Sequence, residues 1–233
     1  MVTASKLINS ILGTLAPRQR EVLSGRFGIE KSKEPETLAA IGDRLNVTRE
    51  RIRQIEKSAL DAVKKHIGEN PSCLEILNDG KKFLKDRGGV ARKEDLLKHL
   101  EEGADGLGEN QLALLLEASG SFFVYLEDKD FWTFYHLGKN ESKLAVNFID
   151  SWKGFLEKQK DAALQGRYEE LLKSFVKSKG VSRQISDAYL SISKQFHANP
   201  YGDMGLREWA EIRPTTIRDR IYLVLKKKSE PLH

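Results

Sequence analysis

The sequence has little cysteine and no long apolar run. Cys73 is the only cysteine among 233 residues, so no disulfide can form within the chain, and a reducing compartment is favoured. A membrane helix needs about eighteen consecutive apolar residues, and no stretch approaches that length. The N-terminus also lacks the charged start and apolar core of a secretory signal. These absences predict a cytoplasmic protein with no membrane partner.

The usual signatures of catalysis are also absent from the sequence. Its 5 histidines are scattered, without the paired spacing of metal ligands. There is no phosphate-binding P-loop and no GxSxG nucleophile elbow, and the glycine-rich stretch 103–108 does not follow a strand of a βαβ unit. We therefore predict a protein that is not an enzyme, with no catalytic residues, no metal, no cofactor and no small-molecule substrate.

Charge is plentiful and unevenly distributed. Apolar residues make up 39% and charged residues 31% of the chain, which is typical of a helix-rich protein with modest cores, and the length predicts two to four small domains. The formal net charge of +5 divides into +4 for residues 1–69, −4 for residues 70–140 and +5 for residues 141–233. The basic ends could therefore meet a polyanion.

Residues 37–64 have the pattern of two helices joined by a tight turn. Apolar residues spaced by three and four predict one face of a first helix: Leu38, Ile41 and Leu45. Gly42 has no side chain, so a second helix could cross closely there. Asn46 tolerates the left-handed backbone that a tight interhelical turn requires.

The second helix is predicted to begin after Thr48, a good N-cap residue. Val47 before it can pack on Ile52 as a hydrophobic staple. Four apolar residues then form the inward face of this helix: Ile52, Ile55, Ala59 and Val63.

The outward face of the second helix is polar near its N-terminus, where it carries Arg49, Glu50, Arg53, Gln54 and Lys57. That end of a recognition helix meets base edges in the major groove of DNA. Arginine can bind guanine, glutamine can bind adenine, and glutamate can accept from the cytosine amino group. Thr48 and Arg51 lie to the sides, where phosphates would be. A merely solvated face is the alternative, but it would not need the framework of Gly42, Asn46 and Thr48.

The strings LAPRQREVLSGRFGIE (residues 15–30) and TLAAIGDRLNVTRERIRQIEKSAL (residues 37–60) closely resemble region 4 of sigma-70 family factors, which act in bacterial transcription initiation. The resemblance implies a helix-turn-helix over about residues 15–65 that binds the minus-35 promoter element. It implies base contacts by Arg49, Glu50 and Gln54. It implies backbone contacts by four further residues: Thr48, Arg51, Arg53 and Lys57.

The same resemblance implies contact with the flap of the RNA polymerase β subunit, through the earlier helices that include residues 15–27. Sigma factors melt DNA through an aromatic-rich region that precedes region 4. The sequence begins at region 4, and nothing similar to the melting region follows. We therefore expect a protein that recognises a promoter site without opening it.

Residues 70–140 are predicted to form three helices and a hairpin, which is the order of a winged helix. The helices are expected around residues 74–84, 92–100 and 110–118, and the hairpin turn at residues 127–130. The third helix is apolar and acidic, which favours protein contact or plain core over phosphate.

Residues 141–213 repeat this order and predict a second winged helix. Its helices are expected at residues 148–160, 168–179 and 182–194, and its hairpin turn near residues 199–205. In this copy three cations could reach a DNA backbone or could be ordinary surface charges: Arg183, Lys194 and Arg207. The tryptophans are expected to be core anchors rather than base-stacking platforms: Trp132, Trp152 and Trp209.

Residues 214–233 resemble the entry into a HARE-HTH domain, as in the delta subunit of bacterial RNA polymerase. Only the first helix of such a domain is present, so we expect that the natural protein continues past His233 or that the chain is shortened. The predicted fold class is thus mainly α, with a helix-turn-helix module (1–69), two winged-helix-like domains (70–140 and 141–213) and a truncated segment (214–233).

Three functions remain open on this basis. The leading hypothesis is a transcription factor that docks on RNA polymerase and reads promoter DNA through residues 48–57. The second is a DNA-binding repressor or nucleoid protein that never touches polymerase. The third is a protein-interaction adaptor, which the acidic middle favours.

Overall fold

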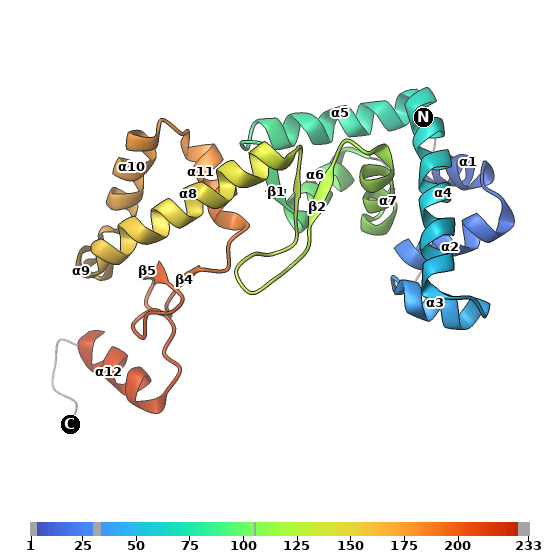
Figure 1. Cartoon of the computed structure of the whole chain (residues 1–233). Coiled ribbons are helices and arrows are strands. Elements are labelled where there is room, and N and C mark those ends of the chain that lie inside the picture. Colours follow the sequence, from blue (N-terminus) through green and yellow to red (C-terminus); the bar gives the residue numbers. More distant parts are fainter. Residues whose placement is uncertain (1–3, 30–33, 105, 228–233) are drawn as a thin grey trace. The chain divides into compact units, whose positions relative to one another are not determined.

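The computed structural model describes residues 4–29, 34–104 and 106–227, which are mainly helical, as predicted (Figure 1). The chain divides into two compact units, and the division does not follow the sequence in order. The N-terminal unit spans residues 1–85, 93–124 and 135–138. The C-terminal unit spans residues 86–92, 125–134 and 139–233. None of the described helices combines the length and apolar character needed to cross a bilayer.

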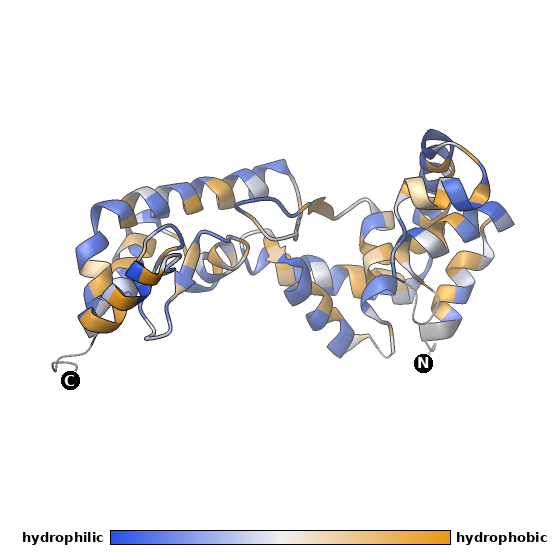
Figure 2. Cartoon of the chain, turned by 90° about the horizontal axis from the view of Figure 1, so that it is seen from below, coloured by the Kyte–Doolittle hydropathy of each residue, from blue (hydrophilic) through white to orange (hydrophobic). Residues whose placement is uncertain are grey.

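The described part of the N-terminal unit is built from helices of 8 to 21 residues, and most of them present one hydrophobic and one hydrophilic side (Figure 2). In chain order they are α1 (Ala4–Gly13), α2 (Pro17–Phe27), α3 (Leu38–Leu45), α4 (Arg49–Glu69), α5 (Pro71–Lys85), α6 (Lys93–Gly103) and α7 (Glu109–Ser119).

Helix α7 joins the later helices of this unit to the earlier ones. It packs against α2 and α4 as well as against α5 and α6. Its leucines Leu112, Leu114, Leu115 and Leu116 are fully buried, and the Asn110 side-chain amide donates a hydrogen bond to the Gly28 carbonyl oxygen over 3.1 Å. The boundary expected at residue 69 therefore falls inside one compact unit, because the apolar side of α7 needs both groups of helices to be buried.

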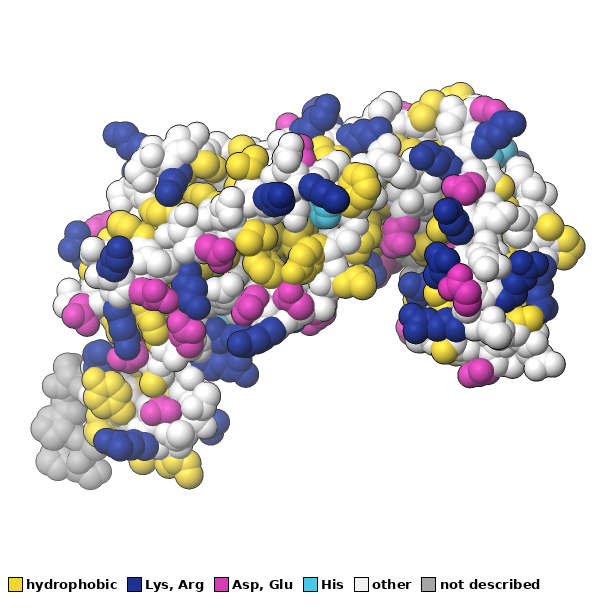
Figure 3. Space-filling view, viewed as in Figure 1, with side chains coloured by type: hydrophobic (Ala, Val, Ile, Leu, Met, Phe, Trp, Pro, Cys, Tyr) yellow, Lys and Arg dark blue, Asp and Glu magenta, His cyan; other side chains and the backbone are white. Residues whose placement is uncertain are grey.

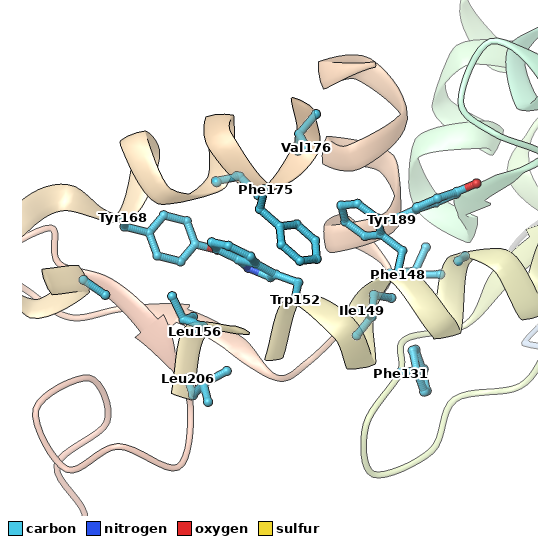
Figure 4. Packing of buried hydrophobic residues seen from close by; sticks show 14 of the residues in the cluster. Phe131, Phe148, Ile149, Trp152, Leu156, Tyr168, Phe175, Val176, Tyr189 and Leu206 are labelled. Atoms are coloured by element: carbon cyan, nitrogen blue, oxygen red, sulfur yellow. The ribbon is translucent and has the colours of Figure 1, made fainter. Parts of the chain in front are cut away.

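The C-terminal unit is built around an aromatic core centred on α8 (Figure 4). Its elements are β1 (Val90–Arg92), α8 (Lys139–Lys158), α9 (Lys160–Ala162), the kinked segment η1 (Ala163–Arg167), α10 (Tyr168–Lys179), α11 (Arg183–Ser191), β4 (Phe196–Ala198), β5 (Met204–Leu206) and α12 (Ile217–Lys227). Trp152 is fully buried, with its ring centroid 5.1 Å from that of Phe175 and 5.5 Å from that of Tyr168. Burial raises the pKa of Tyr168 to about 12. Trp209 is buried as well, so Trp152 and Trp209, two of the three tryptophans, are core residues, as expected.

The strands are short. Strands β2 (Phe123–Tyr125) and β3 (Phe134–His136) lie at positions where the chain passes between the units. Strands β4 and β5 are antiparallel, with Phe196 opposite Leu206, and their hairpin follows α8, α10 and α11 in the order that was expected. The two winged-helix assignments stay predictions.

The segment 125–134 is part of the C-terminal unit, although the sequence places it in the first predicted hairpin. The Trp132 amide donates to the Ile192 carbonyl oxygen over 2.9 Å, and the Lys194 amide donates to the Asp130 carbonyl oxygen over 2.8 Å. Trp132 is half-buried, with the guanidinium of Arg92 and the ammonium of Lys194 each 4.5 Å from its ring centroid. The last division between the compact units falls between residues 138 and 139, two residues before the expected boundary, and residues 125–134 belong with the segment that follows it.

Candidate nucleic-acid interface

The turn between α3 and α4 has the geometry that its residue types predict. Asn46 ends α3 in the left-handed conformation, with φ of 52° and ψ of 47°. A Cβ atom on Gly42 would lie 2.7 Å from the Val47 carbonyl oxygen, so only glycine fits where the turn crosses α3. The two helices are thereby held at a close and defined distance.

Helix α4 begins as the sequence predicts. The Thr48 hydroxyl accepts a hydrogen bond from the Arg51 amide over 3.2 Å and caps the helix. Val47 packs against the small core that α2, α3 and α4 share, whose fully buried members are Val22, Ile41 and Ile52. Ala59 and Val63 are buried further along α4, and Ile55 is partly buried. The cap and the buried side fix which side of α4 faces outward.

All seven residues that the sequence predicts for DNA contact are exposed at the start of α4: Thr48, Arg49, Glu50, Arg51, Arg53, Gln54 and Lys57. Lys and Arg side chains lie beside Asp and Glu side chains over this end of α4 (Figure 3). The surface is therefore open to a large anionic partner.

Four of the seven residues form two hydrogen-bonded pairs. The Arg53 guanidinium donates to both Glu50 carboxylate oxygens, from Nε over 2.8 Å and from Nη2 over 2.7 Å. Arg51 Nη1 donates to Gln54 Oε1 over 3.2 Å. The hydrogen bonds from Arg53 hold the pKa of Glu50 below its usual value, and the Glu50 carboxylate raises the pKa of Arg53.

Arg49 and Lys57 lie outside these pairs. Arg49 lines a shallow hollow of about 460 Å³ together with Arg26, Thr37, Leu38 and Ala39, at the N-terminus of α3. Among the residues that the structure describes, Lys57 has no hydrogen-bond or ion-pair partner.

The same hollow adds two residues that the sequence did not single out for the site. Thr37 caps α3 by accepting a hydrogen bond from the Ala40 amide over 3.1 Å. Arg26 is bound to Glu56 over 3.1 Å, which reduces its availability to an anion. The sequence could have indicated Thr37, because a threonine directly before residues with helical apolar spacing marks the start of a helix.

A larger groove of about 750 Å³ lies between α1, α2 and α3, and its lining includes Leu15, Pro17, Arg20 and Arg44. Arg44 bridges two carboxylates, Glu21 over 2.8 Å and Glu36 over 3.1 Å. The charge of Arg44 is thereby compensated within the groove, which lacks the surplus of positive charge that an anion site requires.

The three cations of the C-terminal unit that could reach phosphates are engaged within that unit. Arg183 pairs with Glu169 over 2.7 Å and with Asp187 over 2.8 Å, and both carboxylates raise its pKa. Lys194 pairs with Glu127 and also donates to the Asp128 carbonyl oxygen over 2.8 Å. Arg207 donates to the Lys129 carbonyl oxygen over 3.4 Å. These contacts favour a structural role for all three.

Metal ligands do not gather in the described part of the chain. No group of three or more His, Cys, Asp or Glu side chains is placed there to hold an ion. Cys73 is buried within the N-terminal unit, and burial raises the pKa of its thiol to about 11. A protonated buried thiol is neither a ligand nor a nucleophile.

Comparison with known proteins places the two exposed pairs inside a known domain. Residues 11–65 match the family model of sigma-70, region 4. The chain is 51% identical over 70 residues to the RNA polymerase sigma factor SigA1 of Synechococcus elongatus and 54% identical over 69 residues to SigA of Clostridium acetobutylicum. It is 49% identical over 53 residues to RpoD of Helicobacter pylori.

These matches cover a small part of each protein. The aligned segment is 30% of this chain and 17% of the length of the Synechococcus and Clostridium proteins. For the Helicobacter protein it is 23% of this chain and 8% of that protein. The likeness therefore concerns a sigma region 4 domain at the N-terminus, and the predicted resemblance to that region is confirmed.

Proposed function

We propose that the protein is a non-catalytic transcription factor of the cytoplasm that reads minus-35-like promoter DNA through the start of α4 and docks on RNA polymerase. The supporting observation is the exposed polar row of α4, held by a capped helix start and a glycine-restricted turn within a sigma region 4 domain. In this proposal Arg49, Glu50 and Gln54 contact bases. The remaining members of the row contact the sugar-phosphate backbone: Thr48, Arg51, Arg53 and Lys57.

The chemistry of these side chains fits the major groove. Arginine and glutamine each offer two hydrogen bonds to one base, and an ionised Glu50 can only accept, as a contact with the cytosine amino group requires. Each such contact contributes about 1–3 kcal/mol of discrimination between bases. We assign to this surface the recognition of a site, and not its opening.

Docking on polymerase would complete the function, because one helix-turn-helix by itself binds DNA weakly. Nonspecific dissociation constants are about 10⁻⁴–10⁻⁶ M at physiological salt. Attachment to polymerase raises the local concentration of the DNA-reading surface beside a promoter. We propose the β flap as the partner and the segment of residues 15–27, which comprises α2 and the turn before it, as part of the surface that binds it.

Selection of bound duplexes from a random pool, with and without RNA polymerase, tests the proposal. We expect one preferred sequence, enriched more strongly with polymerase, and retention of the protein on an isolated β flap. A preferred sequence without retention on polymerase would instead indicate a polymerase-independent repressor. The absence of any preferred sequence in modest salt, with polymerase present, would refute DNA reading by α4.

A further inference from the structure

Arg53 and Glu50 are neighbours on the outer face of α4, and their contact uses both carboxylate oxygens. Their spacing of three residues places the two side chains on the same side of the helix. The guanidinium donates through Nε and Nη2 at 2.8 and 2.7 Å, the parallel two-bond geometry that fixes a carboxylate in one orientation. Both side chains are more than half exposed, so the pair lies where a DNA groove would be.

We infer that Arg53 is a positioning residue for base reading, which holds the Glu50 carboxylate in the orientation in which it accepts a hydrogen bond from a base amino group. This inference rests on the proposed function. It differs from the role that the sequence predicts for Arg53, which is contact with the DNA backbone alone.

The lone pairs of Glu50 permit both contacts at once. Each carboxylate oxygen can accept two hydrogen bonds, and Arg53 supplies one to each oxygen. A lone pair on each oxygen stays available for a base amino group. Arg53 also keeps its Nη1 group outside this two-bond contact, and Nη1 could reach a phosphate at the same time.

Electrostatics gives a second reason for the pairing. A lone carboxylate is repelled by the phosphates that line both sides of the groove, and this repulsion would turn an unpaired Glu50 away from the bases. The guanidinium compensates the carboxylate charge while leaving its acceptor atoms in place. Lys57, which pairs with no carboxylate among the described residues, would strengthen binding to every DNA sequence equally.

The test measures the affinity of the full chain for the preferred duplex from the selection, for duplexes with each base pair changed singly, and for random duplex. The variants are Arg53→Ala, Arg53→Lys, Glu50→Ala and the double Glu50→Ala/Arg53→Ala, with Lys57→Ala as the matched cation control. The dependence of affinity on salt is measured for each.

We expect Glu50→Ala and Arg53→Ala to lose the preference at the same base pair, each by about tenfold. The double variant should lose no more preference than either single variant, because the two residues act as one unit. Compared with Arg53→Ala, Arg53→Lys should restore the salt dependence of binding, because the positive charge returns. It should restore little of the base preference, because an ammonium lacks the planar two-bond geometry of a guanidinium. Lys57→Ala should weaken binding to all duplexes alike.

Two outcomes would overturn the inference. One is an Arg53→Ala protein that binds preferred and random duplexes more weakly by the same factor, with a salt slope lower by about one, as expected for Lys57→Ala. The other is an Arg53→Ala protein that keeps the preference that Glu50→Ala loses. Either leaves base reading by α4 intact, whereas a wild-type protein with no base preference would remove the proposed function itself.

Discussion

At the residue scale, four of the side chains proposed to contact DNA are held in pairs by one another. Arg51 donates to Gln54 and Arg53 donates to Glu50, and each contact connects residues three apart on one helix face. Such pairs are exposed and individually weak, so they orient side chains more than they stabilise the fold. Their effect should appear in base preference and not in the free energy of unfolding.

Replacement of the residues proposed to contact bases tests this arrangement directly. We expect Gln54→Ala and Arg49→Ala each to relax the preference at one base pair by about 1–3 kcal/mol, because each removes a two-bond contact with one base. Binding to singly substituted duplexes measures the effect. Equal losses on preferred and random DNA for both variants would contradict base contact, and unchanged circular dichroism would confirm that both proteins are folded.

Cys73 allows a test of burial that is independent of DNA. Its thiol is fully buried and its pKa is raised to about 11, so the reactive thiolate is scarce at neutral pH. We expect alkylation of the native protein to be far slower than alkylation in denaturant, and to gain speed only as pH approaches that value or the N-terminal unit opens. Equal rates in the native and denatured protein would contradict the packing of α5.

At the scale of the element, the helix-turn-helix depends on its turn. Gly42 lets the turn cross α3 closely, Asn46 ends α3 in the left-handed conformation, and Thr48 caps the start of the next helix. These requirements are local and concern residues within one short segment. The orientation of α4 relative to α3 follows from them.

Two glycine replacements separate close packing from helix propensity. In Gly42→Ala the new methyl group would lie 2.7 Å from the Val47 carbonyl oxygen, so we expect a loss of about 1–3 kcal/mol in the free energy of unfolding. Gly68 lies in α4 with nothing within 4 Å of the added atom, and Gly68→Ala should stabilise the protein by about 0.5–1 kcal/mol. Urea unfolding followed by circular dichroism measures both. A Gly42→Ala protein as stable as the wild type would contradict the close turn.

At the scale of the whole molecule, each compact unit is assembled from segments that are not continuous in the sequence. The N-terminal unit combines the sigma region 4 domain with α5, α6 and α7, and the C-terminal unit takes in residues 86–92 and 125–134. Helix α7 buries its leucines against helices from both sides of residue 69. The stability of the exposed start of α4 should therefore depend on residues well outside it.

A leucine replacement in α7 tests this dependence. Leu115 is fully buried, so Leu115→Ala should cost about 2–5 kcal/mol in the free energy of unfolding of the N-terminal unit. Leu74 in the same unit is 40% exposed, and Leu74→Ala should cost about 1 kcal/mol or less. Urea unfolding followed by circular dichroism gives both values. If the two variants lose the same small amount, α7 does not contribute to the core of the unit.

The features that could be predicted from the sequence are those that depend on contacts between residues close together in the chain. The helix-turn-helix, the cap at Thr48, the turn at Asn46 and the exposed row of α4 depend on contacts within about five residues, and local patterns of residue type specify such contacts. The tertiary structure decided which distant segments share a core and which cations are compensated. Lys194 meets Glu127 across 67 positions of sequence, and Asn110 meets Gly28 across 82. Those partners are chosen by the packing of whole helices, which buries apolar surface wherever it fits, and no local pattern records that choice.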